Sequence, residues 1–455
     1  MVAGSAATGL AVAAAAVAAA GPWESGQRTA ERSYAAARDG HPKPRRHPAA
    51  GSTVSAALPD PWSTAAPAAP VLATVDSAAA PAPAVLKSRL DPLMSAYGLG
   101  RVSTGAVIDV RSGKVLYDRR DGAATTPAST TKLATAVAAL GLLGPGDRLT
   151  TKVVGTGHGR IVLVGGGDPT LELGQLADDT AAALKSAGTT AVTLAYDTSL
   201  YSGPALHPIG YNDNLAPVTA LMVDEGRLDS TTSGPAPRAT DPAAAAAGSF
   251  ARLLTDRGIT VKGAPEPGSG KGGSQLAAHS SAPLSDLVEQ MLTNSDNDLA
   301  EALARQAAHA SGLPAGFSGG AQAIRTALTH YGIPLSGASF HDGSGLDHED
   351  TLAPLTLARL LALAASPAHP ELRSVITGIP VADFTGTLSA RFQGSPAAGV
   401  VHAKTGTLTG TNTIAGTVVT PSGRLLAFSF MTQGADDAAS AETALDDLAA
   451  AVAGS

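Results

Sequence analysis

Three short patterns of residues capable of catalysis occur in a fixed order along this chain of 455 residues. Ser129 is followed three residues later by Lys132, then comes Ser295–Asn297, and last comes Lys404–Gly406. A hydroxyl and an amine three residues apart at the start of a helix lie on one face, so the amine can reach the hydroxyl. We therefore expect Ser129 to be a nucleophile and Lys132 to be the base that accepts its proton.

A lysine acts as a base only when its amine is neutral. Burial and a second cation nearby, such as Lys404, both disfavour the charged form and lower the pKa of the amine. We therefore expect Lys132 and Lys404 to be buried close to each other. The structural alternatives are a helix N-cap for Ser129 and for Asn297, a surface lysine for Lys132 and a solvent-facing strand position for Lys404.

The stretches around these patterns predict the elements that position them. Apolar residues at helical spacing begin at Ala84, and an apolar helical run opens at Ser129 and continues to Leu143. Runs typical of β-strands lie near both ends of this region, at 102–109, 114–117, 400–407, 413–419 and 425–432. Strands at both ends with helices between them predict an α+β fold, in which helices flank an antiparallel five-stranded sheet.

A different pattern interrupts this region from residue 151 onward. Short strands and turns alternate there with one helix, which predicts a smaller inserted α/β domain at 151–232. We assign 84–150 and 233–455 to the main domain. Residues 22–83 are rich in Ala and Pro and predict a disordered linker.

The first 21 residues carry no charge and end in small residues, which predicts a signal peptide or a weak membrane anchor. Glu24 is the first charged residue, whereas a signal peptide normally opens with Lys or Arg, so we expect the true start to lie upstream. An Ala-rich tail without a targeting role is the alternative. The export hypothesis places the protein in the cell envelope, either secreted or associated with the membrane through its N-terminus.

Composition excludes several function classes. The formal net charge is −7, from 31 Lys and Arg against 38 Asp and Glu, which disfavours a nucleic-acid partner. There is no cysteine, so disulfides, thiolate metal sites and a cysteine nucleophile are excluded. The 11 histidines show no pairing with carboxylates at ligand spacing, and Asp168 is interpreted as a turn former, so we expect no metal and no cofactor.

Taken together, the three patterns resemble those of the serine penicillin-recognising enzymes, for which they are a known signature. Within that superfamily the chain is similar to D-alanyl-D-alanine carboxypeptidases of the penicillin-binding protein 4 type (peptidase family S13). The resemblance covers roughly Val85 to Thr432 and includes 163–171 (LVGGGDPTL), 216–225 (APVTALMVDE) and 341–346 (HDGSGL). It implies a β-lactamase/transpeptidase-like main domain. Only 166 positions separate Ser129 from Ser295, fewer than the resemblance implies for members with two inserted domains, so we expect that one inserted domain is kept and that the second is lost or reduced to a loop near 229–238.

The resemblance also implies a role for each residue of the three patterns. Ser129 would attack the carbonyl of the penultimate D-Ala of a peptidoglycan stem peptide ending in D-Ala-D-Ala, and an acyl-enzyme would form. β-Lactams would be covalent inhibitors. The remaining implied roles are proton acceptor for Lys132, proton relay for Ser295, a hydrogen bond to the substrate amide for Asn297, recognition of the terminal carboxylate for Lys404 and Thr405, oxyanion-hole N–H groups for Ser129 and Thr407, and an open strand edge for Gly406.

Two other functions use the same patterns. A serine β-lactamase needs a second base for deacylation, and the nearest similar stretch, 289–294 (EQMLTN), has one residue too many and precedes Ser295 rather than following it. A non-catalytic peptidoglycan-binding protein would keep the fold, but no position of the three patterns is substituted. The carboxypeptidase hypothesis is therefore preferred, and endopeptidase activity on cross-linked peptides stays open.

Overall fold

The computed structural model describes residues 79–96 and 98–455, and every element named below belongs to the unit that begins at Ala73. The expected signal peptide or anchor (1–21) and residues 22–78 of the expected linker lie outside the described residues. The first described helix, α3 (Pro83–Leu93), begins where helical spacing predicts it. In the described part of the chain, no helix combines the length and the hydropathy needed to span a bilayer.

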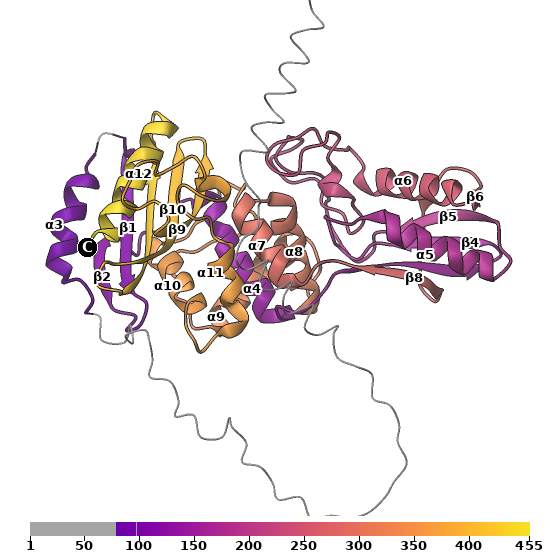
Figure 1. Ribbon diagram of the computed structural model, residues 1–455, viewed down its shortest axis with the longest axis horizontal. Helices are drawn as coiled ribbons and strands as arrows, with labels where there is room; N and C mark the ends of the chain where they lie inside the picture. The colour runs from indigo at the N-terminus through magenta and orange to yellow at the C-terminus, as the bar shows by residue number, and fades with distance from the viewer. Residues whose placement is uncertain (1–78, 97) are drawn as a thin grey trace, which may run out of the picture. The chain divides into compact units, whose positions relative to one another are not determined.

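A five-stranded antiparallel sheet joins the two ends of the described chain, as the sequence predicts (Figure 1). The first strands pair with the last ones because β1 lies directly beside β11, with Val102 opposite Gln433 and Asp109 opposite Leu426. The strands in their order across the sheet are β2 (Val115–Arg119), β1 (Val102–Asp109), β11 (Leu425–Gln433), β10 (Thr411–Val419) and β9 (Val401–Leu408). Strand β9 is therefore an edge strand of this sheet.

Both faces of the sheet are covered because its strands are apolar on both sides. Successive side chains of a strand point to opposite faces, and in β1 Ala106 and Ile108 face one core while Val107 faces another. On the Val107 face lie α3 and α12 (Ala438–Ala453) (Figure 1). The opposite face packs against α10 (Pro354–Ala364).

A group of helices fills the space next to the second face. Helix α4 (Lys132–Leu143) is buried at every position from Lys132 to Leu140, as expected of a helix that is apolar on all sides. It contacts α7, α8, α9, α10 and α11. The helices and helical turns not yet given bounds are α7 (Leu284–Asn294), α8 (Asn297–Ala310), α9 (Phe317–His330), α11 (Arg373–Gly378), η2 (Ala128–Thr131), η3 (Asp224–Gly226), η4 (Pro370–Leu372) and η5 (Gly386–Leu388).

A second, mixed sheet is formed by the interrupting region. Its strands are β6 (Thr260–Val261), β5 (Ala191–Asp197), β4 (Arg160–Val164), β3 (Thr150–Gly157) and β8 (Ser274–Ser280) in spatial order, with β7 (Glu266–Pro267) also paired to β5. Helix α5 (Leu173–Ser186) connects the parallel strands β4 and β5. Helix α6 (Pro242–Asp256) packs against α5 and β5.

This sheet extends beyond residue 232, the limit expected from the sequence. The difference has a physical reason, because β8 completes the sheet by pairing with β3 over more than 100 intervening positions, as in the pair Thr150 and Ser280. Helix α6 buries Phe250 in the same core as Leu163 of β4. The sequence assigned these residues to the main domain, because local periodicity does not indicate which sheet an element joins.

Candidate active site

Ser129 lies in a tight turn directly before α4. The turn η2 covers Ala128–Thr131, and the α-helix itself begins at Lys132 rather than at Ser129. Ala128 has a φ of 48°, in the left-handed region that non-glycine residues rarely adopt, and such strain is often found at functional sites. The N-cap positions of the two helical elements are Pro127 and Thr131, so the N-cap alternative for Ser129 is wrong.

The amine of Lys132 lies within hydrogen-bond distance of three oxygens. Nζ is 3.0 Å from Ser129 Oγ, 2.7 Å from Asn297 Oδ1 and 2.8 Å from the backbone oxygen of Ser344. The last two oxygens can only accept, so they take two N–H groups of the amine. A neutral amine has two N–H groups and one lone pair, so in this arrangement the lone pair is directed at the hydroxyl of Ser129. The geometry therefore fits a base as well as it fits an ammonium ion.

Lys132 is fully buried, and burial lowers its pKa from about 10.5 to about 8. The nearby carboxylates of Asp342, Asp296, Glu301 and Asp298 act in the opposite direction and limit this fall. The structure excludes the surface-lysine alternative. A pKa of about 8 gives a useful neutral fraction near physiological pH, which is the condition for general-base catalysis.

Lys404 is also fully buried, so a solvent-facing position on β9 is wrong. Its Nζ donates to Ser295 Oγ at 2.9 Å and to the backbone oxygen of Thr405 at 2.7 Å. Burial, Lys132 and Arg391 all lower the pKa of Lys404 well below its usual value. The charge of Lys132 thus acts on Lys404, as expected of two amines that are buried close to each other.

Ser295–Asn297 forms the junction between two helices. Ser295 ends α7 with a φ of 58°, and the Asp296 side chain caps α8 by accepting from the N–H of Leu299 at 2.9 Å. Asp296 is therefore the cap residue, a role that the sequence alternative gave to Asn297. Asn297 instead accepts from Lys132 and donates Nδ2 to the backbone oxygen of Asn214 at 2.9 Å.

Glycine is required at position 406 of β9 for a steric reason that differs from the one expected from the sequence. A Cβ there would lie 2.3 Å from Thr413 Oγ1, 2.8 Å from the oxygen of Pro127 and 3.0 Å from the nitrogen of Ser129. Only glycine lets β9 approach the turn that carries Ser129 this closely. The glycine thus secures the distance between the strand and the nucleophile, whereas the sequence suggested only that it keeps the strand edge open to substrate.

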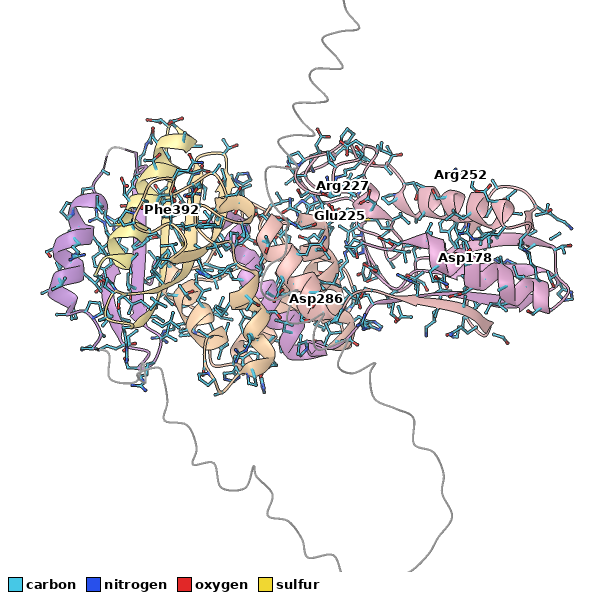
Figure 2. All side chains as sticks on the ribbon, viewed as in Figure 1. Asp178, Glu225, Arg227, Arg252, Asp286 and Phe392 are labelled. Carbon is cyan, nitrogen blue, oxygen red and sulfur yellow. The ribbon has the colours of Figure 1, made fainter. Side chains whose placement is uncertain are left out.

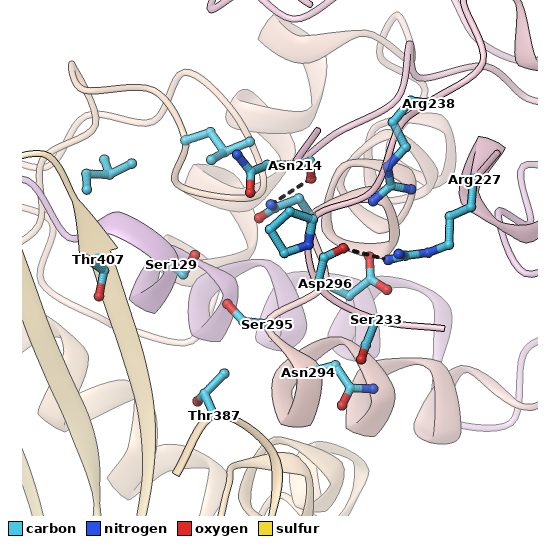
Figure 3. A pocket seen from close by; sticks show the side chains of 15 residues that line it. Ser129, Asn214, Arg227, Ser233, Arg238, Asn294, Ser295, Asp296, Thr387 and Thr407 are labelled. Atoms are coloured by element: carbon cyan, nitrogen blue, oxygen red, sulfur yellow. Dashed lines mark hydrogen bonds between the residues drawn. The ribbon is translucent and has the colours of Figure 1, made fainter. Parts of the chain in front are cut away.

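One pocket of about 450 Å³ is lined by Ser129, by Ser295–Asn297 and by Thr407, which directly follows the third pattern, whereas Lys132 and Lys404 are buried behind its surface (Figure 3). The side chains of Ser129 and Ser295 lie between Thr407 of β9 on one side and the segment of Arg227 and Arg238 on the other (Figure 3). The full lining is Ser129, Asn214, Arg227, Ser233, Gly234, Pro235, Arg238, Asn294, Ser295, Asp296, Asn297, Leu346, Thr387, Thr407 and Leu408. The expected convergence of distant segments on one crevice is therefore present, with Thr405 next to the pocket through its hydrogen bond to Thr387.

Sequence reasoning missed the segment 227–238 as a pocket wall. Arg227 donates to Glu225, which lies beside it (Figure 2), and to the backbone oxygen of Gly234. Arg238, which also lines the pocket (Figure 3), forms an ion pair of 3.0 Å with Asp298. Burial and the neighbouring carboxylates raise the pKa of Glu225 to about 9 and that of Asp298 to about 7. No local pattern indicates these pairs. The stretch 216–225 did appear in the resemblance, but without an assigned role.

The loop at 342–347 overlaps the stretch 341–346 of the resemblance, to which the sequence assigned no role, and it borders the site. The backbone oxygen of Ser344 contacts Lys132, and a Cβ on Gly345 would lie 2.0 Å from the oxygen of Ala128. His207 lies 3.0 Å from Asp342, although the two are 135 positions apart, so the histidine–carboxylate pair was invisible to a search by sequence spacing.

Three groups of side chains among the described residues could in principle hold a metal ion. They are His207 with Glu301 and Asp342, His341 with Asp347 and Glu349, and Glu225 with Asp296 and Asp298. In the first group the oxygens of Glu301 and Asp342 already accept hydrogen bonds from backbone N–H groups. Asp168 accepts from Thr170 N and Oγ1, which is the turn-forming role expected of it.

Comparison with known proteins gives one family. The model of a family described as the D-Ala-D-Ala carboxypeptidase 3 (S13) family matches residues 86–238 and 230–452. A carboxypeptidase of Mycobacterium tuberculosis is 35% identical over 387 residues, covering 79% of this chain and 82% of that protein. Carboxypeptidase DacB of Mycolicibacterium smegmatis is 36% identical over 419 residues, covering 85% of this chain and 89% of that protein.

A solved structure supports the fold. Penicillin-binding protein 4 (dacB) of Haemophilus influenzae superposes with a TM-score of 0.67 at 25% identity, covering 81% of this chain and 97% of that one. The same protein has been solved in complex with a novel β-lactam. The two family matches meet at 230–238, which is the segment where the sequence predicts the loss of a second inserted domain.

Proposed function

The chain belongs to the D-Ala-D-Ala carboxypeptidase 3 (S13) family and is a serine-type D-alanyl-D-alanine carboxypeptidase, and from this premise we propose how its residues carry the reaction. The observation that carries the proposal is the position of the Lys132 amine. Two of its N–H groups are taken by Asn297 and Ser344, and the third direction points to Ser129 at 3.0 Å.

In the first step, Ser129 Oγ attacks the carbonyl carbon of the penultimate D-Ala while Lys132 accepts the hydroxyl proton. The negative charge that develops on the carbonyl oxygen is stabilised by the backbone N–H groups of Ser129 and Thr407. These two groups come from η2 and β9, the elements that Gly406 allows to pack closely.

In the second step, the C–N bond breaks and the terminal D-Ala leaves as an amine. Its nitrogen needs a proton, and the proton that Lys132 took from Ser129 passes to it through the hydroxyl of Ser295, which Lys404 holds by a hydrogen bond, so Lys132 is neutral again. Water then attacks the acyl-enzyme and gives a proton to Lys132, which returns it to Ser129 Oγ as the shortened peptide leaves. The net reaction consumes one water and breaks one peptide bond.

Lys404 and Thr405 recognise the terminal carboxylate of the substrate. The pKa of Lys404 is lowered by burial and by two neighbouring cations in the free protein. A carboxylate placed next to this amine favours its charged form, so substrate binding raises the pKa of Lys404 and strengthens the recognition. β-Lactams present a carboxylate and a strained amide to the same groups, and we expect them to acylate Ser129.

Peptidoglycan lies outside the cytoplasmic membrane, so the enzyme acts there. We propose that residues 1–21 direct export, either as a cleaved signal or as a weak anchor. We also propose that the peptidase domain comprises residues 84–149 and 281–455, with 150–280 as the inserted domain, because these limits keep each sheet whole.

The test is incubation of the purified protein with a defined pentapeptide and with a cross-linked dimer, followed by mass spectrometry. The proposal predicts release of one D-Ala from the pentapeptide, and none by the Ser129→Ala variant. The rate of dimer cleavage relative to pentapeptide cleavage measures the endopeptidase activity of the enzyme. An unchanged pentapeptide in the presence of folded protein would contradict the proposal.

A further inference from the structure

The loop at 342–347 supplies one of the two acceptors that orient the Lys132 amine. The backbone oxygen of Ser344 takes an N–H of this amine at 2.8 Å, and the other acceptor is Asn297. If the Ser344 oxygen moved, the direction of the amine's lone pair toward Ser129 would no longer be fixed. What holds this loop therefore influences the proton transfer.

Helix α8 holds the loop from below through one carboxylate. Glu301 Oε1 accepts from the backbone N–H of Gly343 at 3.0 Å and of Ser344 at 2.8 Å. Gly343 lies so close to the helix that a Cβ on it would be 2.5 Å from Ala304 Cβ. These contacts fix the distance between the loop and α8.

Asp342 closes the loop on itself. Its Oδ1 accepts from Gly345 N at 2.6 Å, and its Oδ2 accepts from Asp347 N at 2.8 Å. The carboxylate is buried, and two side chains also contact its Oδ2: the hydroxyl of Ser344 donates to it at 3.3 Å, and His207 Nε2 lies 3.0 Å from it. His207 belongs to the segment that follows β5 of the second sheet.

The tautomer of His207 follows from its other nitrogen. Nδ1 lies 3.2 Å from the backbone N–H of Ile209 and accepts from it, so the proton of the neutral ring is on Nε2 and is donated to Asp342. The ring is buried and packs edge-on against Phe317, with the ring centroids 5.1 Å apart. His207 is therefore fixed in place as a donor to the loop.

We propose that His207 is a positioning residue for acylation: it holds Asp342, Asp342 holds the loop, and the Ser344 oxygen of the loop orients the Lys132 amine toward Ser129. The inference rests on the proposed function, since it assigns His207 to the step in which Lys132 acts. The segment that follows β5 would then influence catalysis through His207, without contacting the substrate.

The charges around this network predict opposite effects on the pKa of Lys132. The charged groups that face His207 are Asp342, Glu301 and Asp347, and those that face Lys132 are Asp342, Asp296, Glu301, Asp298 and Lys404. Without His207, Asp342 keeps the backbone N–H groups of Gly345 and Asp347 and the hydroxyl of Ser344, but it loses the N–H dipole that partly screens its negative charge. Its field at Lys132 then grows, so the pKa of Lys132 rises.

Removal of a negative charge from the same network has the reverse effect. Glu301→Gln keeps an oxygen that can accept from Gly343 and Ser344, so the loop stays in place. The carboxylate that raises the pKa of Lys132 is gone, and this pKa falls. The two substitutions therefore separate positioning from charge.

The experiment measures acylation of the full chain by a fluorescent penicillin as a function of pH. We expect His207→Leu to lower the acylation rate about 10- to 100-fold and to shift the ascending limb to higher pH. We expect His207→Gln, whose amide can still donate to Asp342, to recover most of the rate. Glu301→Gln should acylate within about threefold of the unchanged protein, with the limb shifted to lower pH.

The matched control is Tyr201→Phe. Tyr201 lies on the same segment as His207, and its hydroxyl lies 3.2 Å from the oxygens of both Gly167 and Ala302, so its hydrogen bonds do not involve the loop. The substitution keeps the ring, which belongs to the apolar cluster against which Leu346 of the loop packs. It should lower the melting temperature as His207→Leu does and leave acylation and its pH dependence unchanged. The inference would be overturned if His207→Leu had the acylation rate and the pH dependence of the unchanged protein. It would also be overturned if the ascending limb of the pH–rate profile of Glu301→Gln did not shift to lower pH. An unchanged protein that fails to label at all would overturn the proposed function and the inference together.

Discussion

The two walls of the active-site pocket are held in different ways. One wall is strand β9 with the turn of Ser129, and backbone pairing to β10 together with the close contact at Gly406 fixes it. The other wall is the segment 227–238, which buried ion pairs fix instead, among them Arg238 with Asp298. The first wall carries the chemistry that the sequence shows directly, and the second shapes the space around it.

This difference teaches which kind of change each wall tolerates. A strand wall depends on small distances between backbones, so it is sensitive to added volume. A wall held by buried charges is sensitive to the loss of one partner, because the other is then left buried without compensation. Substitutions on the first wall should therefore alter the acylation rate, and substitutions behind the second should alter stability first.

We expect the largest effect from a substitution of Lys132, the proposed general base. Lys132→Arg keeps a positive charge but cannot lose its proton, so acylation by penicillin should fall about 10²- to 10⁴-fold. The control is Lys152→Arg on the exposed side of β3. A rate within about threefold of the unchanged protein would mean that Lys132 is not the base.

The next effect tests the charged wall. Arg238→Gln leaves Asp298 buried without its cation, and unfolding by urea at pH 8 should show a loss of about 3 kcal/mol. The matched control is Arg257→Gln, whose partner Asp178 is exposed, and it should change little. Equal losses in the two variants would remove the distinction between the walls.

The pH dependence of acylation sharpens the account of the base. Lys132 must be neutral, and below its pKa of about 8 it is protonated. The rate should therefore rise roughly 50-fold between pH 6 and pH 8, in proportion to the neutral fraction, and level off above pH 9. A flat profile from pH 6 to pH 9 would contradict the assignment of Lys132.

The smallest expected effect concerns the strand wall. Gly406→Ala places a Cβ against Thr413, Pro127 and Ser129 and should separate β9 from the nucleophile turn. We expect kcat/KM to fall about tenfold. Gly146→Ala, where no atom lies within 4 Å of the added Cβ, is the control. An unimpaired Gly406→Ala variant would show that this close approach is not needed.

The same contrast explains how much could be predicted from the sequence. The alternation of apolar residues predicted the strand wall, and its strands at 401–408 and 411–419 differ from the expected ranges by one or two residues. The helix start at Ser129 was wrong by three residues because a tight helical turn has nearly the same local spacing as an α-helix. Strand β8 was missed as part of the second sheet because its pairing is long-range.

Within the site, residue types identified the three patterns but not their support. Asn297, which is expected to contact the substrate, lines the pocket, and the sequence did not indicate that its side chain also contacts Lys132 and Asn214. The partners His207 and Asp342 are 135 positions apart, and Ala216 donates to Asp298 across 82 positions. Such pairs depend on how the chain returns on itself, which periodicity does not reveal.

The most direct test of the central claim is the site of acylation. After incubation with a penicillin, the protein should gain the mass of one inhibitor molecule, and peptide mapping should place it on Ser129. Ser129→Ala should gain no mass under the same conditions. An adduct on another residue, or an adduct of equal yield in the Ser129→Ala variant, would contradict the account.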